Sequence, residues 1–378
     1  MVVLALVVPG GWLAVRALGK PSCGPLTAFT VAAAAEIAPA VRAAAEEWAA
    51  EGAESGETCV TIDVTGAEPV DIAAAVASRH GVTLTGVGQA AGTTPVPDVW
   101  LPDSSVWLSR LAATASGFTP SSASVALSPV VLAMPEPVAS QFGWPESTLS
   151  WGNLVRQLGT GTQVRTGIVE PTRDVAGLSG LLALSQAAGA GGAESQQATT
   201  GALRSLAAGR SLLRPDLLAR FPRSPDPASV ASALGAAPLS EQAVISYNAA
   251  KPPIGLAALY VQPAPLPLDY PYAVMPGIDP AKERAATRFR DVLREGRFAD
   301  RLARLGLRGP DGVGGSGFPA PTGAPAPAGT PLPAGDPGQA PGAGVDPAAV
   351  ERALSTWTSI TLPARMLAVV DVSGSMRE

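Results

Sequence analysis

The sequence is poor in the residue types that build most metal centres. It holds one histidine, His80, and two cysteines among 378 residues, which excludes a zinc cluster made from these side chains. Charged residues make up 15% of the chain and aromatic residues 5%, and the formal net charge is -5. Nucleic-acid-binding domains usually carry a basic patch, so this charge gives no reason to expect a nucleic-acid partner.

Signatures of catalysis are also missing from the sequence. It has no Gly-x-Ser-x-Gly motif, and the glycine-rich stretch at 159–167 lacks the lysine of a phosphate-binding loop. Carboxylates are frequent, but nothing in their spacing marks an acid–base pair. We therefore expect a binding protein and not an enzyme.

The first twenty residues are strongly apolar. Residues 2–15 carry no charge, and Arg16 and Lys20 follow this run instead of preceding it. Its length is typical of the hydrophobic region of a signal peptide and short for a complete membrane span. We interpret 1–20 as a signal or transmembrane anchor segment, which places the protein at the extracytoplasmic face of the cell membrane. A buried N-terminal strand or helix is the alternative.

Both cysteines lie next to strand-like runs. Cys23 precedes the run at 26–35, and Cys59 opens the run at 59–65. Strands that follow each other in sequence are often neighbours, so a Cys23–Cys59 disulfide is plausible. Loop closure would make it worth about 4 kcal/mol, and an exported location would preserve it. Two unrelated buried thiols are the alternative.

Strands and helices alternate along most of the chain. Strand-like runs at 26–35, 59–65 and 97–102 are each followed by a helix-like stretch, which is typical of an α/β fold with a parallel sheet. Further strands are predicted at 124–136, 240–248 and 271–277. Further helices are predicted from Ser150, within 172–189 and, as an amphipathic pair, within 280–307.

The composition changes after residue 308. Residues 309–345 contain nine prolines and eleven glycines, so this tract is predicted to be an extended linker that buries little apolar surface. Structure is expected to resume at Asp346, a good N-cap residue before Pro347. In the helix that follows, Val350, Leu354 and Trp357 fall on one face.

Residues 22–308 resemble the type II periplasmic-binding-protein class of extracellular solute-binding proteins. Four stretches carry the resemblance in the order of that family: TVAAAAEIAPAV, PDVWLPDSSVWL, TGIVEPTRDVAGLSGLLAL and ATRFRDVLREGRFADRLARLGLRGPDG. The resemblance implies two α/β lobes around a ligand cleft. Another kind of α/β domain is the alternative.

The resemblance also implies where a ligand would bind. In molybdate-type members a hydroxyl at the first strand–helix turn helps to hold an oxyanion, and Glu36 occupies that point here. A carboxylate would repel an anion, so the cleft is expected to take a different small molecule or to have become a protein-binding surface. The candidate cleft residues are Ala35, Glu36, Asp103, Ser104, Thr172, Asp174 and Tyr247.

A second resemblance lies in the last residues. The stretch MLAVVDVSGSM resembles the first strand and metal-site motif of the von Willebrand factor A domain, a Rossmann-like fold. Oxygen ligands from Asp371, Ser373 and Ser375 would suit Mg²⁺ or another divalent cation, and a polar loop after a buried strand is the alternative. That family completes the site with a Thr and an Asp from later loops. We interpret 346–378 as the truncated start of such a domain and expect its incomplete site to hold no ion.

Three functions agree with these features. The first is a membrane-anchored, extracytoplasmic protein that combines both domains and recognises a ligand or a protein at the cell surface. The second is a substrate-binding receptor that hands a small solute to an ABC permease. The third is a cytoplasmic chelatase- or ATPase-associated protein, against which the N-terminal apolar segment and the predicted disulfide argue.

Overall fold

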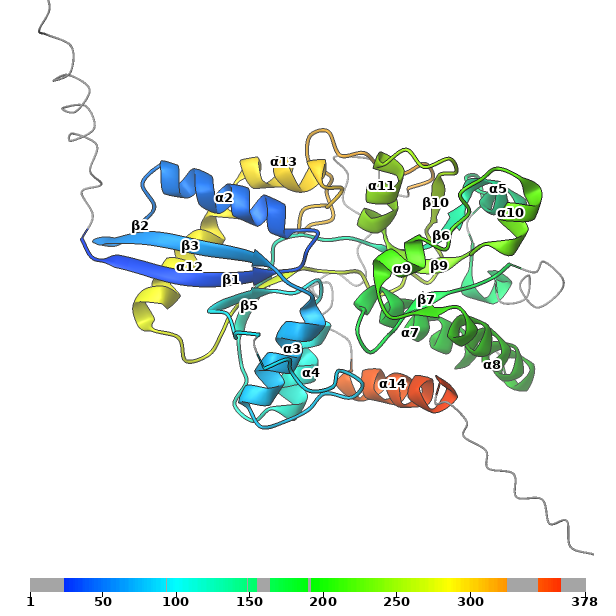
Figure 1. Ribbon diagram of the computed structural model, residues 1–378, viewed down its shortest axis with the longest axis horizontal. Coiled ribbons are helices and arrows are strands. Elements are labelled where there is room, and N and C mark those ends of the chain that lie inside the picture. Colours follow the sequence, from blue (N-terminus) through cyan, green and yellow to red (C-terminus); the bar gives the residue numbers. More distant parts are fainter. Residues whose placement is uncertain are drawn as a thin grey trace, which may run out of the picture.

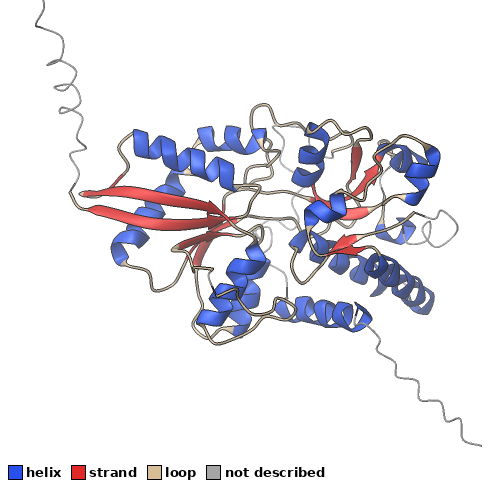
Figure 2. Cartoon of the chain, viewed as in Figure 1, coloured by secondary structure: helices blue, strands red, loops and turns tan. Residues whose placement is uncertain are grey.

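The chain forms two lobes, one built on a six-stranded sheet and the other on a three-stranded and a two-stranded sheet (Figure 1). The computed structural model describes residues 24–92, 94–147, 149–154, 164–189, 192–324 and 346–361. Lobe A is formed by residues 24–124 and 271–304, and lobe B by the described residues within 130–259. Helices and strands contribute to both lobes (Figure 2), which confirms the predicted α/β class.

Lobe A contains a mixed sheet with the strand order β2-β3-β1-β4-β11-β5. Its strands are β1 (Leu26–Ala33), β2 (Glu54–Ser55), β3 (Thr58–Gly66), β4 (Val99–Leu101), β5 (Ser121–Ser124) and β11 (Pro271–Val274). β3, β1 and β4 are parallel to one another, whereas β2, β11 and β5 pair in antiparallel fashion. The predicted parallel sheet is therefore correct at its centre and wrong at both edges.

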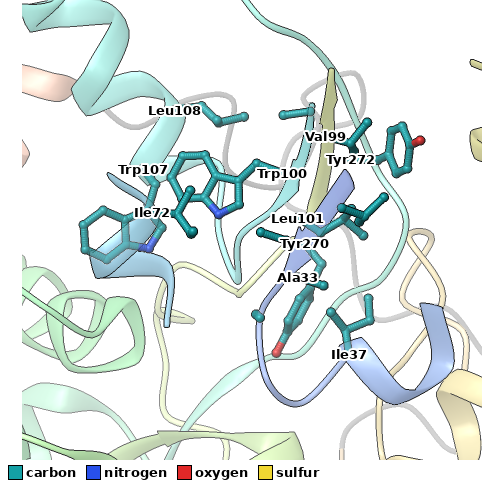
Figure 3. Packing of buried hydrophobic residues seen from close by; sticks show 14 of the residues in the cluster. Ala33, Ile37, Ile72, Val99, Trp100, Leu101, Trp107, Leu108, Tyr270 and Tyr272 are labelled. Carbon is teal, nitrogen blue, oxygen red and sulfur yellow. The ribbon is translucent and has the colours of Figure 1, made fainter. Parts of the chain in front are cut away.

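Helices cover both faces of this sheet. They are α2 (Ala38–Ala50), α3 (Pro69–Arg79), α4 (Val106–Thr114), α12 (Pro280–Val292) and α13 (Gly296–Arg304). α2, α12 and α13 pack together on one face, and α3 and α4 pack together on the other (Figure 1). The predicted apolar stripes explain this arrangement, because Val41, Ile72 and Phe289 are all buried in one cluster. Figure 3 shows part of that cluster around β4.

Lobe B is built on the antiparallel order β10-β6-β9. Its strands are β6 (Val130–Pro135), β9 (Ala237–Ser240), β10 (Leu256–Leu259) and the parallel pair β7 (Ile168–Val169) and β8 (Arg210–Ser211). A parallel bridge between Thr166 and Ala236 places β7 beside β9. The helices are α5 (Glu136–Ala139), α7 (Val175–Gly189), α8 (Gly192–Ala208), α9 (Arg214–Leu218), α10 (Pro227–Ser232) and α11 (Glu241–Ala249).

The chain crosses between the lobes through a short hinge. Residues 125–129 lead from β5 to β6, and Ser128 pairs with Leu268 on the returning segment through two backbone hydrogen bonds of 2.8 and 2.9 Å. Leu127 pairs in the same way with Arg308. The prediction of one strand at 124–136 is therefore wrong. The sequence at 124–136 is mostly apolar because the segment that crosses between the lobes is buried as well as β6. It is not a single strand.

The hinge also contains a fully buried ion pair. Arg308 donates from Nε and Nη2 to the two carboxylate oxygens of Glu241 at 2.7 and 2.8 Å, and both side chains are 0% exposed. Tyr260 donates its hydroxyl to the same carboxylate. The guanidinium lies 4.6 Å from the ring centre of Phe318, so the pair is enclosed on all these sides.

Two other predictions about structure are corrected. The strand predicted at 240–248 is wrong: Ser240 ends β9 and accepts a hydrogen bond from the backbone of Ala243 at 3.1 Å, which caps α11, and residues 241–248 belong to that helix. The tract at 309–345 was expected to be extended, yet residues 309–324 pack on the domain through the buried Phe318. Residues 325–345 lie outside the described part.

The predicted C-terminal helix is confirmed as α14 (Pro347–Thr361), with Val350, Leu354 and Trp357 buried. It packs against α4 of lobe A and against α7 and α8 of lobe B. The sequence assigns this helix to the start of a separate domain, whereas in the structure its apolar face packs on both lobes. An amphipathic stripe shows that a helix needs a partner surface, but it does not identify that surface.

Several predicted features lie outside the described residues. These are the apolar segment 1–20, Cys23, and the motif with Asp371, Ser373 and Ser375. The Cys59 thiol is not free, since it is disulfide-bonded, but the Cys23–Cys59 pairing stays a prediction. Within the described ranges, no helix is both long enough and apolar enough to cross a membrane.

Replacing Arg308 with methionine is expected to destabilise the protein by about 3–5 kcal/mol, because Glu241 would keep its buried charge without a partner. The midpoint of urea unfolding measures this loss. The control is Arg294→Met, which breaks an exposed pair with Asp291 and should change the midpoint little. Equal midpoints for the two variants would contradict a structural role for the buried pair.

Candidate ligand-binding cleft

A cleft of about 470 Å³ lies between the two lobes. Its walls come from the turns that follow β1 and β4 in lobe A and β7 and β8 in lobe B, together with the first residues of α3 and one face of α11. In α/β folds, ligands bind outside the carboxyl ends of strands, where such turns converge. The principal lining residues are Glu36, Glu68, Asp103, Arg173, Asp174, Leu213, Arg214 and Tyr247.

The lobe A wall is held in place by buried neighbours. Glu36 lies in the turn between β1 and α2, and its Oε1 accepts a hydrogen bond from the Tyr270 hydroxyl at 2.9 Å. Asp103 follows β4, and its Oδ1 accepts from the Trp107 indole at 2.9 Å. Both donors belong to the lobe A core, so the packing of that core sets the direction of the two carboxylates.

The lobe B wall is formed by two turns. Asp174 lies between β7 and α7, where its Oδ1 accepts from the backbone of Gly177 at 2.8 Å and so caps α7. The second turn joins β8 to α9 and brings Leu212 and Leu213 to the cleft with 60% and 49% of their surface exposed. These two adjacent side chains give this wall of the cleft an apolar part.

Arg214 bridges the two walls. Its guanidinium donates to Asp174 Oδ2 at 3.0 Å within lobe B and to Glu36 Oε1 at 3.5 Å across the cleft. Burial disfavours the charged form of Arg214 and lowers its pKa. The negative charges of Asp174 and Glu36 have the larger, opposite effect, so the pKa of the Arg214 guanidinium is raised above its ordinary value. Glu36 therefore does not present an uncompensated charge, contrary to what its place in the sequence suggests.

Two other carboxyl groups of the cleft have no ion-pair partner in the part of the chain that the structure describes. Burial, together with the charges of Glu36 and Asp174, raises the pKa of Asp103 well above its usual range. Burial also raises the pKa of Glu68. These two groups are the acceptors that a solute could satisfy, because each is costly to bury as an unpaired anion.

Five of the seven predicted cleft residues line the cleft: Ala35, Glu36, Asp103, Asp174 and Tyr247. The other two are buried beside it. Ser104 accepts from the backbone of Val106 at 3.2 Å, and Thr172 donates to Glu170 at 3.1 Å. Their hydroxyl groups support the turns instead of facing the cleft.

The sequence alone did not indicate Arg214, the residue that joins both walls. It stands in an Arg-Pro pair that begins α9, and Pro in the first turn of a helix was the one available signal. Among the residues that the structure describes, those of the cleft included, no group of three or more His, Cys, Asp or Glu side chains could hold a metal ion. The cleft therefore offers hydrogen-bond acceptors, one bridging cation and apolar side chains.

The variant Asp103→Asn is expected to gain stability relative to the parent protein as pH rises above about 4. A raised pKa in the folded protein means that stability present below the unfolded pKa of 3.8 is lost as Asp103 ionises. The amide has nothing to ionise and still accepts from Trp107. Thermal unfolding between pH 4 and pH 8 measures the difference, and a constant difference across that range would contradict the assignment.

The family and fold are supported by comparison with known proteins. A family model described as bacterial extracellular solute-binding protein matches residues 29–308. No curated protein matches the chain significantly. Among solved structures, an extracellular solute-binding protein of Bordetella parapertussis, described as putative, shares the fold with a TM-score of 0.56 at 13% identity, covering 88% of this chain and 97% of its own.

Two further structures show the same fold. The periplasmic binding protein AfuA of Actinobacillus pleuropneumoniae has a TM-score of 0.55 at 8% identity, covering 89% of this chain and 99% of its own. A periplasmic thiamin binding protein has a TM-score of 0.53 at 14% identity, covering 91% of this chain and 100% of its own. At these identities the likeness concerns the fold alone. The matched family model spans well over half of the sequence, and the chain belongs to the family of bacterial extracellular solute-binding proteins.

Proposed function

We propose that the protein is an extracytoplasmic substrate-binding receptor, which captures a small polar solute between its lobes and delivers it to an ABC permease. The cleft between the lobes carries this proposal, since both lobes contribute polar and apolar side chains to it. Membership of a solute-binding family supports it as well. Families of this kind bind solutes and are generally not enzymes.

The size of the cleft suits a small molecule. Ligand sites in proteins typically enclose about 300–1,000 Å³, and the volume here is about 470 Å³. Leu212 and Leu213 stand at its edge with much of their surface exposed. Closure of the lobes over a solute would bury these side chains and remove water from the polar groups.

The polar groups favour one class of solute. Four carboxyl groups line the cleft, Glu36, Glu68, Asp103 and Asp174, against the two guanidinium groups of Arg173 and Arg214. Arg214 is already shared by two of the acids, and Arg173 lies 3.8 Å from Asp71 of α3. A solute with a positive charge or several hydrogen-bond donors would satisfy Asp103 and Glu68, and a cation would favour the ionised form of these two groups, whose pKa values are raised by burial. An oxyanion would instead meet guanidinium groups that already lie against carboxylates.

Titration calorimetry with three sets of probes tests the proposal: small amines and guanidines, neutral sugars, and the oxyanions sulfate and molybdate. Binding is expected from the cationic or neutral donor-rich set. Asp103→Asn should weaken it about tenfold or more, because a charge-assisted hydrogen bond becomes a neutral one. The matched control is Asp291→Asn on the exposed side of α12, which should leave affinity unchanged.

Two outcomes would count against this function. Tight binding of an oxyanion would contradict the class of solute. A cleft that is empty in native mass spectrometry of protein from its own host, together with no binding to any probe, would contradict the receptor itself. That result would favour the other proposal, a membrane-anchored recognition protein with a von Willebrand A domain, in which Asp371, Ser373 and Ser375 contribute to a Mg²⁺ site.

A further inference from the structure

Helix α14 spans the boundary between the lobes (Figure 1). Its residues lie outside the stretch that matches the family, which ends at residue 308. Val350 and Leu354 are buried in the cluster that fills lobe A, whereas Trp357 is buried in a cluster of lobe B. One apolar face therefore packs on both lobes at once.

A buried arginine of lobe A forms an ion pair with this helix. Arg110 of α4 has a side chain that is only 1% exposed, and its Nε lies 3.2 Å from Glu351 of α14. The same guanidinium donates to the backbone oxygen of Thr85 at 2.8 Å. With α14 in place, Glu351 supplies the counter-charge that this buried guanidinium needs. The surface of lobe A is therefore complementary to α14 in charge as well as in shape.

The contact with lobe B reaches the cleft wall. Trp357 donates its indole hydrogen to Glu170 Oε1 at 2.9 Å, and both groups are buried. Glu170 also accepts from Thr172 and lies 3.2 Å from Arg210 at the start of β8. The residues 170–174 form the turn that carries Asp174 into the cleft, so one carboxylate joins α14 to that turn.

Lobe A touches the same turn directly. Gly86 has a φ of +72°, and a Cβ atom there would lie 2.3 Å from the Cγ2 of Thr172. Only glycine allows so close an approach. The turn 170–174 is thus enclosed by the Gly86 loop, by Trp357 and by β8.

We propose that α14 is an intramolecular strap, which holds the two lobes in the orientation seen here and fixes the conformation of the cleft turn 170–174. Undocking of α14 would loosen that turn and allow the lobes to separate. Coupling between two sites is reciprocal in free energy, so undocking of α14 would also affect solute entry. This consequence rests on the proposed receptor function. The strap itself does not depend on any solute.

Hydrogen exchange measured by mass spectrometry on the full chain tests the strap. Leu354→Asp places a charge in the buried face, whereas Ser355→Asp places the same charge on the exposed face of the same helix. Leu354→Asp is expected to speed exchange by about tenfold or more in α14 and in the turn 170–174. Ser355→Asp should leave both unchanged.

A milder variant separates the strap from a general loss of folding. Trp357→Phe keeps most of the apolar volume and removes only the indole donor to Glu170. Exchange is expected to rise in the turn 170–174 while α14 stays protected. Small-angle scattering should also show a larger radius of gyration for Leu354→Asp than for Ser355→Asp.

The inference is overturned if the turn 170–174 exchanges at the parental rate in both Leu354→Asp and Trp357→Phe. It is also overturned if undocking α14 leaves the radius of gyration unchanged. None of these measurements uses a solute, so failure to find a solute would count against the proposed function and not against the strap.

Discussion

The ion pair between Arg308 and Glu241 is the interaction on which the arrangement of the lobes depends. The backbone of Arg308 pairs with Leu127 at the crossing, and Glu241 begins helix α11, whose Tyr247 lines the cleft. Since neither charge reaches water, each must keep its partner with good geometry. The pair therefore fixes a wall of the cleft relative to the hinge, although neither of its two side chains lines the cleft.

The cleft combines this fixed frame with weaker contacts across its opening. Arg214 and Glu36 belong to different lobes and are 3.5 Å apart, and the Arg214 side chain keeps 23% of its surface exposed. At 3.5 Å this contact across the cleft is longer than the 3.0 Å contact between Arg214 and Asp174 within lobe B. The frame can therefore be rigid while the opening stays adjustable, and a solute needs only to replace or share this longer contact in order to enter.

Long periodic patterns made most helices predictable. α2, α3, α12 and α14 each present several turns of apolar residues at helical spacing, and all four are present. Short segments were less predictable: a nine-residue segment such as 240–248, with three apolar residues at its centre, fits a strand or a helix equally well, and the capping geometry of Ser240 decides. Family resemblance located four cleft residues in turns that follow strands, and a fifth, Tyr247, which lies in helix α11. It could not locate Arg214, whose role arises from contacts with Asp174 and Glu36 that are distant in sequence.

The discontinuous make-up of lobe A has a consequence for the order of folding. β4 has β1 on one side, but its other neighbour is β11, where Ala273 pairs with Trp100. The whole of lobe B lies between these two strands in the chain, so the β6, β9 and β10 sheet can form from a continuous stretch while lobe A cannot. Pairings between residues so far apart in sequence slow folding, because long loops must close first. The sheet that contains β1 is therefore completed only after β11 has joined β4.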